Sequence, residues 1–138
     1  MWLAASVASI AGAAGAADLR VAVAGVRSQT GQVLVALCSA ERFLGEGCER
    51  SGSAPARAGV TQVVLEDVPE GVFALQAIYD ENGNRVVDRS ILGLPREGIG
   101  FSRDAPMRRG SPRFADAAVS VRAAGGATEL RLRYFGQR

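Results

Sequence analysis

Residues 60–79, VTQVVLEDVPEGVFALQAIY, contain two runs of alternating side chains on either side of a turn. Alternation with a period of two is typical of a β-strand that buries one face. The turn lies at Pro69-Glu70-Gly71, because Pro presets φ and Gly permits a positive φ. The stretch therefore predicts a β-hairpin. The buried face of its second strand would carry Phe73, Leu75, Ala77 and Tyr79.

The same alternation extends along the rest of the chain. It predicts a first hairpin of residues 19–26 and 33–37 around 27–31, and a last strand pair of residues 114–121 and 128–135 around Gly125-Gly126. Phe43 and Leu44 are expected to close one end of the core, residues 45–59 to form a loop, and residues 80–113 a long irregular stretch. No helical period of any length occurs. The predicted fold class is therefore all-β, an antiparallel β-sandwich of about seven strands with one long loop.

The first 17 residues differ from the rest. They carry no charge, are mostly Ala or apolar, and end in Ala14-Gly15-Ala16-Ala17, which suits cleavage after Ala16 or Ala17. We therefore expect residues 1–17 to be a signal peptide and residues 18–138 to form one sandwich domain, periplasmic or secreted. An uncleaved membrane anchor is the alternative, but the run is shorter than the ~20 residues of a spanning helix. We expect no transmembrane segment in the mature chain.

Cys38 and Cys48 are the two cysteines of the 138-residue chain. In an exported protein an even number of cysteines indicates a disulfide, whereas in the cytosol it would suggest a metal or a catalytic thiol. Zinc is disfavoured because the chain has no His to complete four ligands. The expected role of the pair is a structural disulfide.

The long stretch begins with DENGNRVVD, residues 80–88, in which oxygen ligands follow the spacing of a calcium loop. The residues that would bind calcium are Asp80, Asn82, Asn84, the carbonyl of Val86, and Asp88. Two positions depart from that pattern: Arg85 stands where the turn needs Gly, and Ile91 where a bidentate Glu is expected. An Asx-rich turn, in which Asp and Asn side chains bond to their own backbone, is the competing interpretation. Calcium is thus one possible cofactor, and no other is indicated.

The composition removes several classes of chemistry. Without His, neither a Ser-His-Asp nor a Cys-His mechanism can be drawn. A hydrolase working through carboxylates is left as an alternative, with Glu97 and Asp104, or Asp80 and Asp88, as acid pairs. A net charge of +2 with few aromatic residues gives no support for a nucleic-acid partner.

Several motifs resemble a family of exported bacterial proteins called domain of unknown function 2141. The motifs are YDENGN (residues 79–84), Asp88, LGLPREG (92–98), GFS (100–102) and FADAA (114–118). The resemblance covers about residues 19–134 and implies an immunoglobulin-like or transthyretin-like β-sandwich without an assigned activity. Residues 66–75 also resemble transthyretin-like sandwiches, but the hydrolases of that group rely on histidines that this chain lacks. Their activity is therefore not transferred.

Together these observations predict a non-enzymatic binding or interaction module of the cell envelope that uses the 80–113 loop. A calcium-stabilised structural domain is the first alternative and the carboxylate hydrolase the second. The partner would be another envelope protein or a glycan. The residues expected at the contact surface are Arg96, Glu97, Phe101, Ser102 and Arg103.

Overall fold

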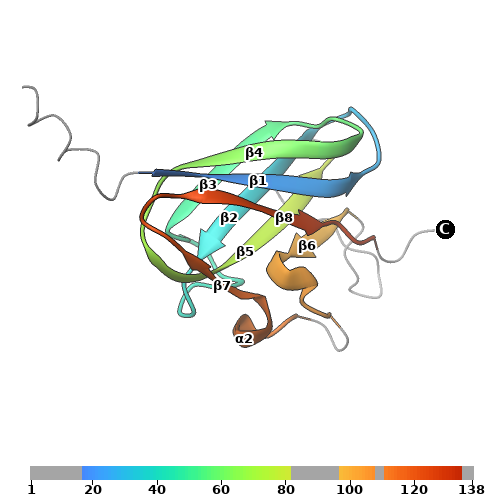
Figure 1. The fold of residues 1–138 in the computed structure, drawn as a ribbon. Coiled ribbons are helices and arrows are strands. Elements are labelled where there is room, and N and C mark those ends of the chain that lie inside the picture. Colours follow the sequence, from blue (N-terminus) through green and yellow to red (C-terminus); the bar gives the residue numbers. More distant parts are fainter. Residues whose placement is uncertain (1–16, 82–96, 108–110, 135–138) are drawn as a thin grey trace, which may run out of the picture.

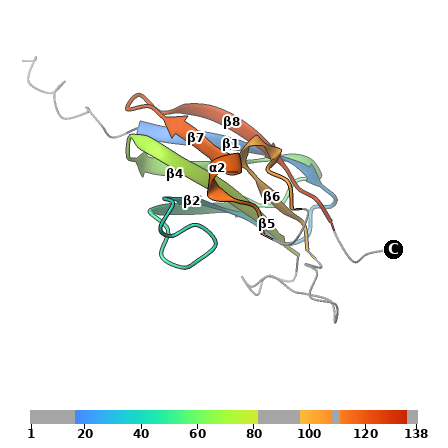
Figure 2. The same cartoon turned by 90° about the horizontal axis from the view of Figure 1, so that it is seen from below.

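A computed structural model describes residues 17–81, 97–107 and 111–134, and it contains two β-sheets. Figure 1 shows a three-stranded sheet in the order β4-β1-β8 and a five-stranded sheet in the order β3-β2-β5-β6, with β7 also paired to β5. The strands are β1 Ala17–Val26, β2 Gln32–Cys38, β3 Arg50–Pro55, β4 Gly59–Val68, β5 Gly71–Asp80, β6 Ile99–Phe101, β7 Ala118–Val121 and β8 Gly126–Arg131. The two sheets stack as layers (Figure 2), which confirms the predicted all-β sandwich. One pair departs from the antiparallel expectation, since β8 runs parallel to β1.

The core lies between the sheets and includes the four residues of β5 that the alternation assigned to a buried face. Leu37, Leu75 and Tyr79 are fully buried, and the apolar positions of β1 and β4 face them. Burial of aliphatic side chains at about 25 cal/mol per Å² is the main favourable contribution to such a core. The period-two pattern therefore correctly predicted the buried face of β5. The members of the core on β1, β2 and β4 are Leu19, Val21, Val23, Val26, Val33, Val35, Leu37, Val63, Leu65 and Val68.

The pairing of the strands differs from the prediction, because none of the three expected hairpins forms. Residues 27–31 lead from β1 in one sheet to β2 in the other, and the turn at Pro69-Glu70 leads from β4 to β5 in the same way. The last expected pair is also divided, since β7 pairs with β5 and β8 pairs with β1. A tight turn can join two strands of the same sheet or two strands of opposite sheets. In both cases each strand can bury its apolar face in the core.

Regular structure also occurs where the sequence predicted none. Residues 50–55 form edge strand β3, and residues 99–101 form β6 inside the stretch expected to be irregular. Gly52 allows β3 to lie close to β4, because a Cβ at position 52 would lie 2.8 Å from the carbonyl oxygen of Val64 on β4. Conversely, Phe114–Ala117, expected to begin a strand, forms the short helix α2.

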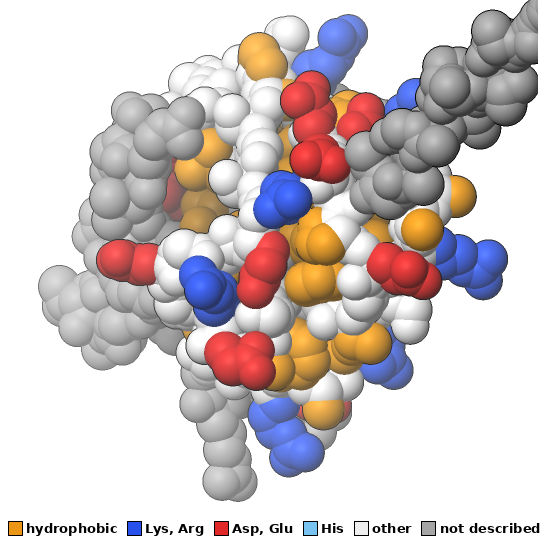
Figure 3. Space-filling view, turned by 90° about the vertical axis from the view of Figure 1, so that its left-hand side faces the viewer, with side chains coloured by type: hydrophobic (Ala, Val, Ile, Leu, Met, Phe, Trp, Pro, Cys, Tyr) orange, Lys and Arg blue, Asp and Glu red, His pale blue; other side chains and the backbone are white. Residues whose placement is uncertain are grey.

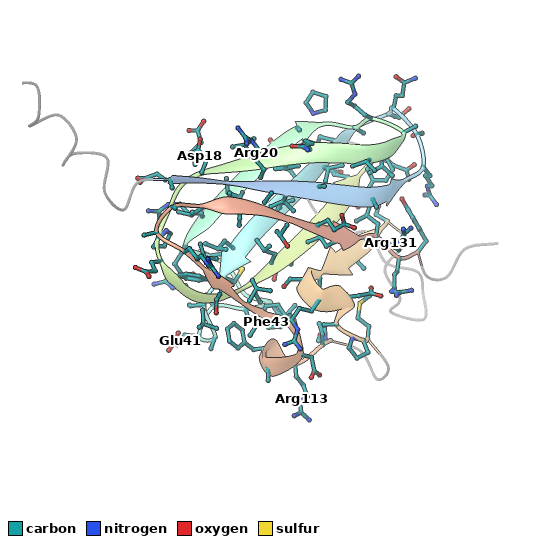
Figure 4. All side chains as sticks on the ribbon, in the orientation of Figure 1. Asp18, Arg20, Glu41, Phe43, Arg113 and Arg131 are labelled. Atoms are coloured by element: carbon teal, nitrogen blue, oxygen red, sulfur yellow. A yellow bond between two sulfur atoms is a disulfide. The ribbon has the colours of Figure 1, made fainter. Side chains whose placement is uncertain are left out.

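A second, smaller apolar cluster covers part of the outer face of the five-stranded sheet. Its buried members are Ala74, Phe101, Ala105 and Ala117. The ring of Phe43 packs edge-on against those of Phe101 and Phe114, each at 5.8 Å between centroids. Figure 4 shows Phe43 on the side of its loop that faces α2, whereas Glu41 points to solvent. Leu44, expected beside Phe43 in the core, is instead 42% exposed.

Candidate functional site

The two ends of the sandwich differ in character. The end where β1 begins presents acidic, basic and hydrophobic side chains side by side (Figure 3), and its exposed residues include Asp18, Glu66 and Val72. At the other end four chain segments converge: residues 25–31, the end of β5 at 79–81, residues 97–98, and Tyr134. We call this second end the Tyr79 end. It contains both boundaries of residues 82–96, and therefore the start of the predicted functional loop.

The Tyr79 side chain joins the end of β5 to the β1–β2 connection. Tyr79 is fully buried, and its hydroxyl donates to the carbonyl oxygen of Thr30 at 2.7 Å and lies 2.5 Å from Ser28 Oγ. The Tyr79 N–H donates to the carbonyl oxygen of Gly98 at 2.9 Å. A buried phenol needs such partners, since an unpaired polar group in the interior costs about 1–3 kcal/mol. Tyr79 thereby links three of the four segments.

A second connection is made by an ion pair on the surface of the same end. Arg27 donates from Nε to Glu81 Oε2 at 3.0 Å and from Nη2 to Oε1 at 2.5 Å, a bidentate arrangement. The Arg27 guanidinium lies 4.5 Å from the centroid of the Tyr134 ring, and the Tyr134 hydroxyl donates to the carbonyl oxygen of Gly25 at 2.7 Å. The hydrogen bonds to Glu81 raise the pKa of Arg27, and burial raises the pKa of Tyr134.

Two buried carboxyl groups flank residues 82–96. Asp80, on the last position of β5, is fully buried, and Glu97 is 4% exposed. Glu97 Oε2 accepts a hydrogen bond from the Glu81 N–H at 3.2 Å. Burying a carboxylate is unfavourable unless it is paired and hydrogen-bonded, so two in one place need a specific environment. Among the described residues, the other buried polar side chains are Thr61 and Ser102.

Of the five residues predicted to bind calcium, only Asp80 is among the described residues. Asn82, Asn84, Val86 and Asp88 lie outside them. Within residues 17–81, 97–107 and 111–134, no group of three or more Asp, Glu or Cys side chains is placed to hold a metal ion. The acids considered for hydrolysis have separate partners: Glu97 accepts from Glu81, and Asp104 forms an ion pair with Arg133. The calcium and hydrolase hypotheses stay predictions.

The residues expected to form a contact surface lie in different environments. Glu97, Phe101 and Ser102 are buried, Arg103 is exposed, and Arg96 lies outside the described part of the chain. The expectation that the three buried side chains face a partner is therefore corrected. Ser102 Oγ accepts from the Leu75 N–H at 3.0 Å and donates to the Ala117 carbonyl oxygen at 2.5 Å. The GFS motif thus attaches β6 and α2 to β5.

The disulfide predicted between Cys38 and Cys48 is formed, with 2.03 Å between the sulfur atoms. It closes a loop, residues 39–47, that is also held by hydrogen bonds. Glu49 accepts from the Ser39 N–H at 2.8 Å, and Arg42 Nη1 donates to the Gly47 carbonyl oxygen at 2.6 Å. Hydrogen bonds from Ser39 lower the pKa of Glu49. The pair has the structural role expected of it.

Sequence reasoning missed the partners of the Tyr79 end. Arg27 and Ser28 were assigned only to a turn, and Tyr134 only to a strand. They contact residues 51 to 109 positions away in the chain. A polar run of five residues between two apolar strands, 27–31, is the one signal that could have indicated them, since hairpin turns are commonly shorter.

The described residues form an all-β sandwich domain with one disulfide and with a polar hydrogen-bond network at one end. A family model matches residues 21–129, and its description is an uncharacterized protein conserved in bacteria, domain of unknown function 2141. The chain belongs to this family. No curated protein and no solved structure matches the sequence. Among the described residues, no helix has the length and apolar character needed to cross a membrane.

Proposed function

We propose that this chain is an exported, non-enzymatic binding module of the bacterial cell envelope whose contact surface lies at the Tyr79 end of the sandwich. Export is supported by the uncharged, alanine-rich stretch of residues 1–17 and by the Cys38–Cys48 disulfide. Disulfides persist in the periplasm and outside the cell, and are rare in reducing compartments.

The observation that carries the proposal is the bracing of the Tyr79 end. Tyr79, Glu81 and Glu97 fix both boundaries of residues 82–96 to the β1–β2 connection and to each other. Loops that bind partners are commonly presented by a rigid scaffold, and long loops in small domains tend to be functional.

The exposed side chains of this end are the candidates for direct contact. Gln29 and Thr30 are exposed beside the half-exposed Arg27–Glu81 pair. These groups offer an amide, a hydroxyl and a bidentate ion pair, which suit a polar partner such as an envelope protein or a glycan. Phe101 and Ser102 belong to the second apolar cluster and to its attachment to β5 rather than to this surface.

Site-specific photo-crosslinking in living cells tests the proposal. A photoreactive amino acid at Thr30 should give a covalent adduct with an envelope partner, whereas the same amino acid at Val72 should not. Val72 is a matched control because it is 57% exposed at the start of β5, at the other end of the sandwich. Equal labelling from both positions, or none from Thr30 and its neighbour Gln29, would contradict the proposal.

A calcium-stabilised domain is the second candidate, and the spacing of the oxygen ligands Asp80, Asn82, Asn84 and Asp88 in the sequence favours it. An ion that binds only the folded chain adds about 2.7 kcal/mol to the free energy of unfolding when its concentration is about 100 times its dissociation constant. The thermal midpoint should therefore rise in calcium relative to chelator, and the rise should vanish in Asp80→Asn but not in Asp104→Asn. Equal midpoints in calcium and chelator would remove this candidate.

A further inference from the structure

The outer face of the five-stranded sheet contains a groove that the second apolar cluster leaves open. Two cross-strand rows form it, Ser53–Leu34–Ile78 and Ser51–Ala36–Gln76, on β3, β2 and β5. The groove has a volume of about 430 Å³, and none of its lining residues is charged. Leu34, Ala36 and Ile78 are half-buried, so the floor is aliphatic and partly exposed to solvent.

Beside this groove the disulfide-closed loop presents an exposed leucine. Leu44 is 42% exposed and has a φ of 68°, a left-handed conformation that is unfavourable for a residue with a Cβ. Its N–H donates to Gln76 Oε1 at 3.3 Å, and Gln76 lines the groove. The neighbouring Phe43 anchors the loop on Phe101 and Phe114. Figure 2 shows the loop projecting from the outer side of the five-stranded sheet.

We propose that this face binds a second copy of the chain, with Leu44 of each copy inserted into the groove of the other. An exposed apolar side chain and an uncharged groove with an aliphatic floor lie next to each other on this face. A two-fold axis between them would bring each Leu44 against the Leu34–Ile78 floor of the other copy, which is the arrangement of an isologous dimer. The proposal concerns a different face from the Tyr79 end and does not depend on the function proposed there.

The charge distribution favours a second copy on this face. A surface that meets itself places like charges opposite one another, and an uncharged lining avoids that repulsion. The outer face of the three-stranded sheet does not meet this condition, since it bears exposed Asp18, Arg20 and Arg131 (Figure 4).

Sedimentation equilibrium of the oxidised protein tests the proposal between about 1 μM and about 1 mM. The wild-type chain should dimerise, and Leu44→Arg and Ala36→Glu should each weaken the dimer at least ~100-fold, because every change acts twice. The control Val60→Arg, an exposed position on the opposite sheet, should leave dimerisation unchanged. If Ala36→Glu does not fold, Ser53→Glu on the exposed rim replaces it.

A mixture of the two variants tests reciprocity. Equimolar Leu44→Arg and Ala36→Glu chains should form a heterodimer, in which the introduced arginine meets the introduced glutamate and the second contact is wild-type. Recovery of dimer in the mixture, with neither variant dimeric alone, would establish the reciprocal contact. A wild-type monomer at every concentration would overturn the proposal and leave the groove to an extended segment of another protein. A mixture of the two variants that stays monomeric would also overturn the proposal. The same holds if Val60→Arg weakens the dimer as much as Leu44→Arg does.

Discussion

The packing of Gly31 against the end of β5 gives the sharpest test of how the Tyr79 end is built. Gly31 has a φ of 82°, and a Cβ at this position would lie 2.2 Å from the carbonyl oxygen of Asp80 and 2.7 Å from Glu81 Cα. Both atoms belong to backbone, which cannot rotate away as a flexible side chain would. Gly31→Ala should therefore displace the segment that carries Asp80 and Glu81.

The expected magnitude follows from a matched glycine. Gly59 has a similar φ of 94°, but a Cβ added there would have no neighbouring atom within 4 Å. Gly59→Ala should show only the left-handed backbone penalty of about 1–2 kcal/mol, offset by about 0.4–1 kcal/mol of reduced entropy in the unfolded chain. Gly31→Ala adds the displacement of backbone, for which overpacking costs of about 1–3 kcal/mol are typical. We expect it to lose about 2–4 kcal/mol, against about 1 kcal/mol for Gly59→Ala.

Urea unfolding of the two variants and the wild-type chain measures the difference. The single Trp is at position 2, in the predicted signal peptide, so the transition is followed by circular dichroism. With a slope of about 1–3 kcal/mol per M, the two variants should differ in midpoint by about 1 M. Free energies of unfolding that agree within about 0.5 kcal/mol would refute the close contact between Gly31 and the end of β5.

Three further predictions concern the Cys38–Cys48 disulfide and the polar network of the Tyr79 end. Replacing Cys38 and Cys48 together by Ser should lower the free energy of unfolding by about 2–3 kcal/mol, and reductant should then have no further effect on the thermal midpoint. A double-mutant cycle of Arg27→Ala and Glu81→Ala should give a coupling of about 1 kcal/mol that decreases in high salt, because the pair is partly exposed. Burial raises the pKa of Tyr134, so the unfolded chain loses this proton first and stability should fall as pH rises above about 10. The slope of unfolding free energy against pH between about 9 and about 11 should be smaller in Tyr134→Phe; an unchanged slope would contradict the role of burial.

The sequence was informative about burial and uninformative about strand partners. Alternation assigned Phe73, Leu75 and Ala77 to a buried face correctly, because the period of a strand determines which side chains share a face. It did not distinguish a hairpin from a crossing between sheets, because both place the same face inward. The parallel pairing of β1 and β8 likewise joins segments about 107 residues apart, such as Leu19 and Gly126, and no local signal encodes it.

The same distinction between local and distant information applies to the Tyr79 end. Asp80 stood out because it begins an Asx-rich run, a local property. The residues on either side of Asp80, Tyr79 and Glu81, are held by Ser28 and Arg27, which lie 51 and 54 positions away in the chain. Gly31 combines both kinds of information: its positive φ is a turn property that the sequence suggests, whereas the 2.2 Å approach of its Cβ position to Asp80 arises only when β2 pairs with β5. Residues whose contacts depend on distant strand pairing position the site, and they can be recognised only in the folded molecule.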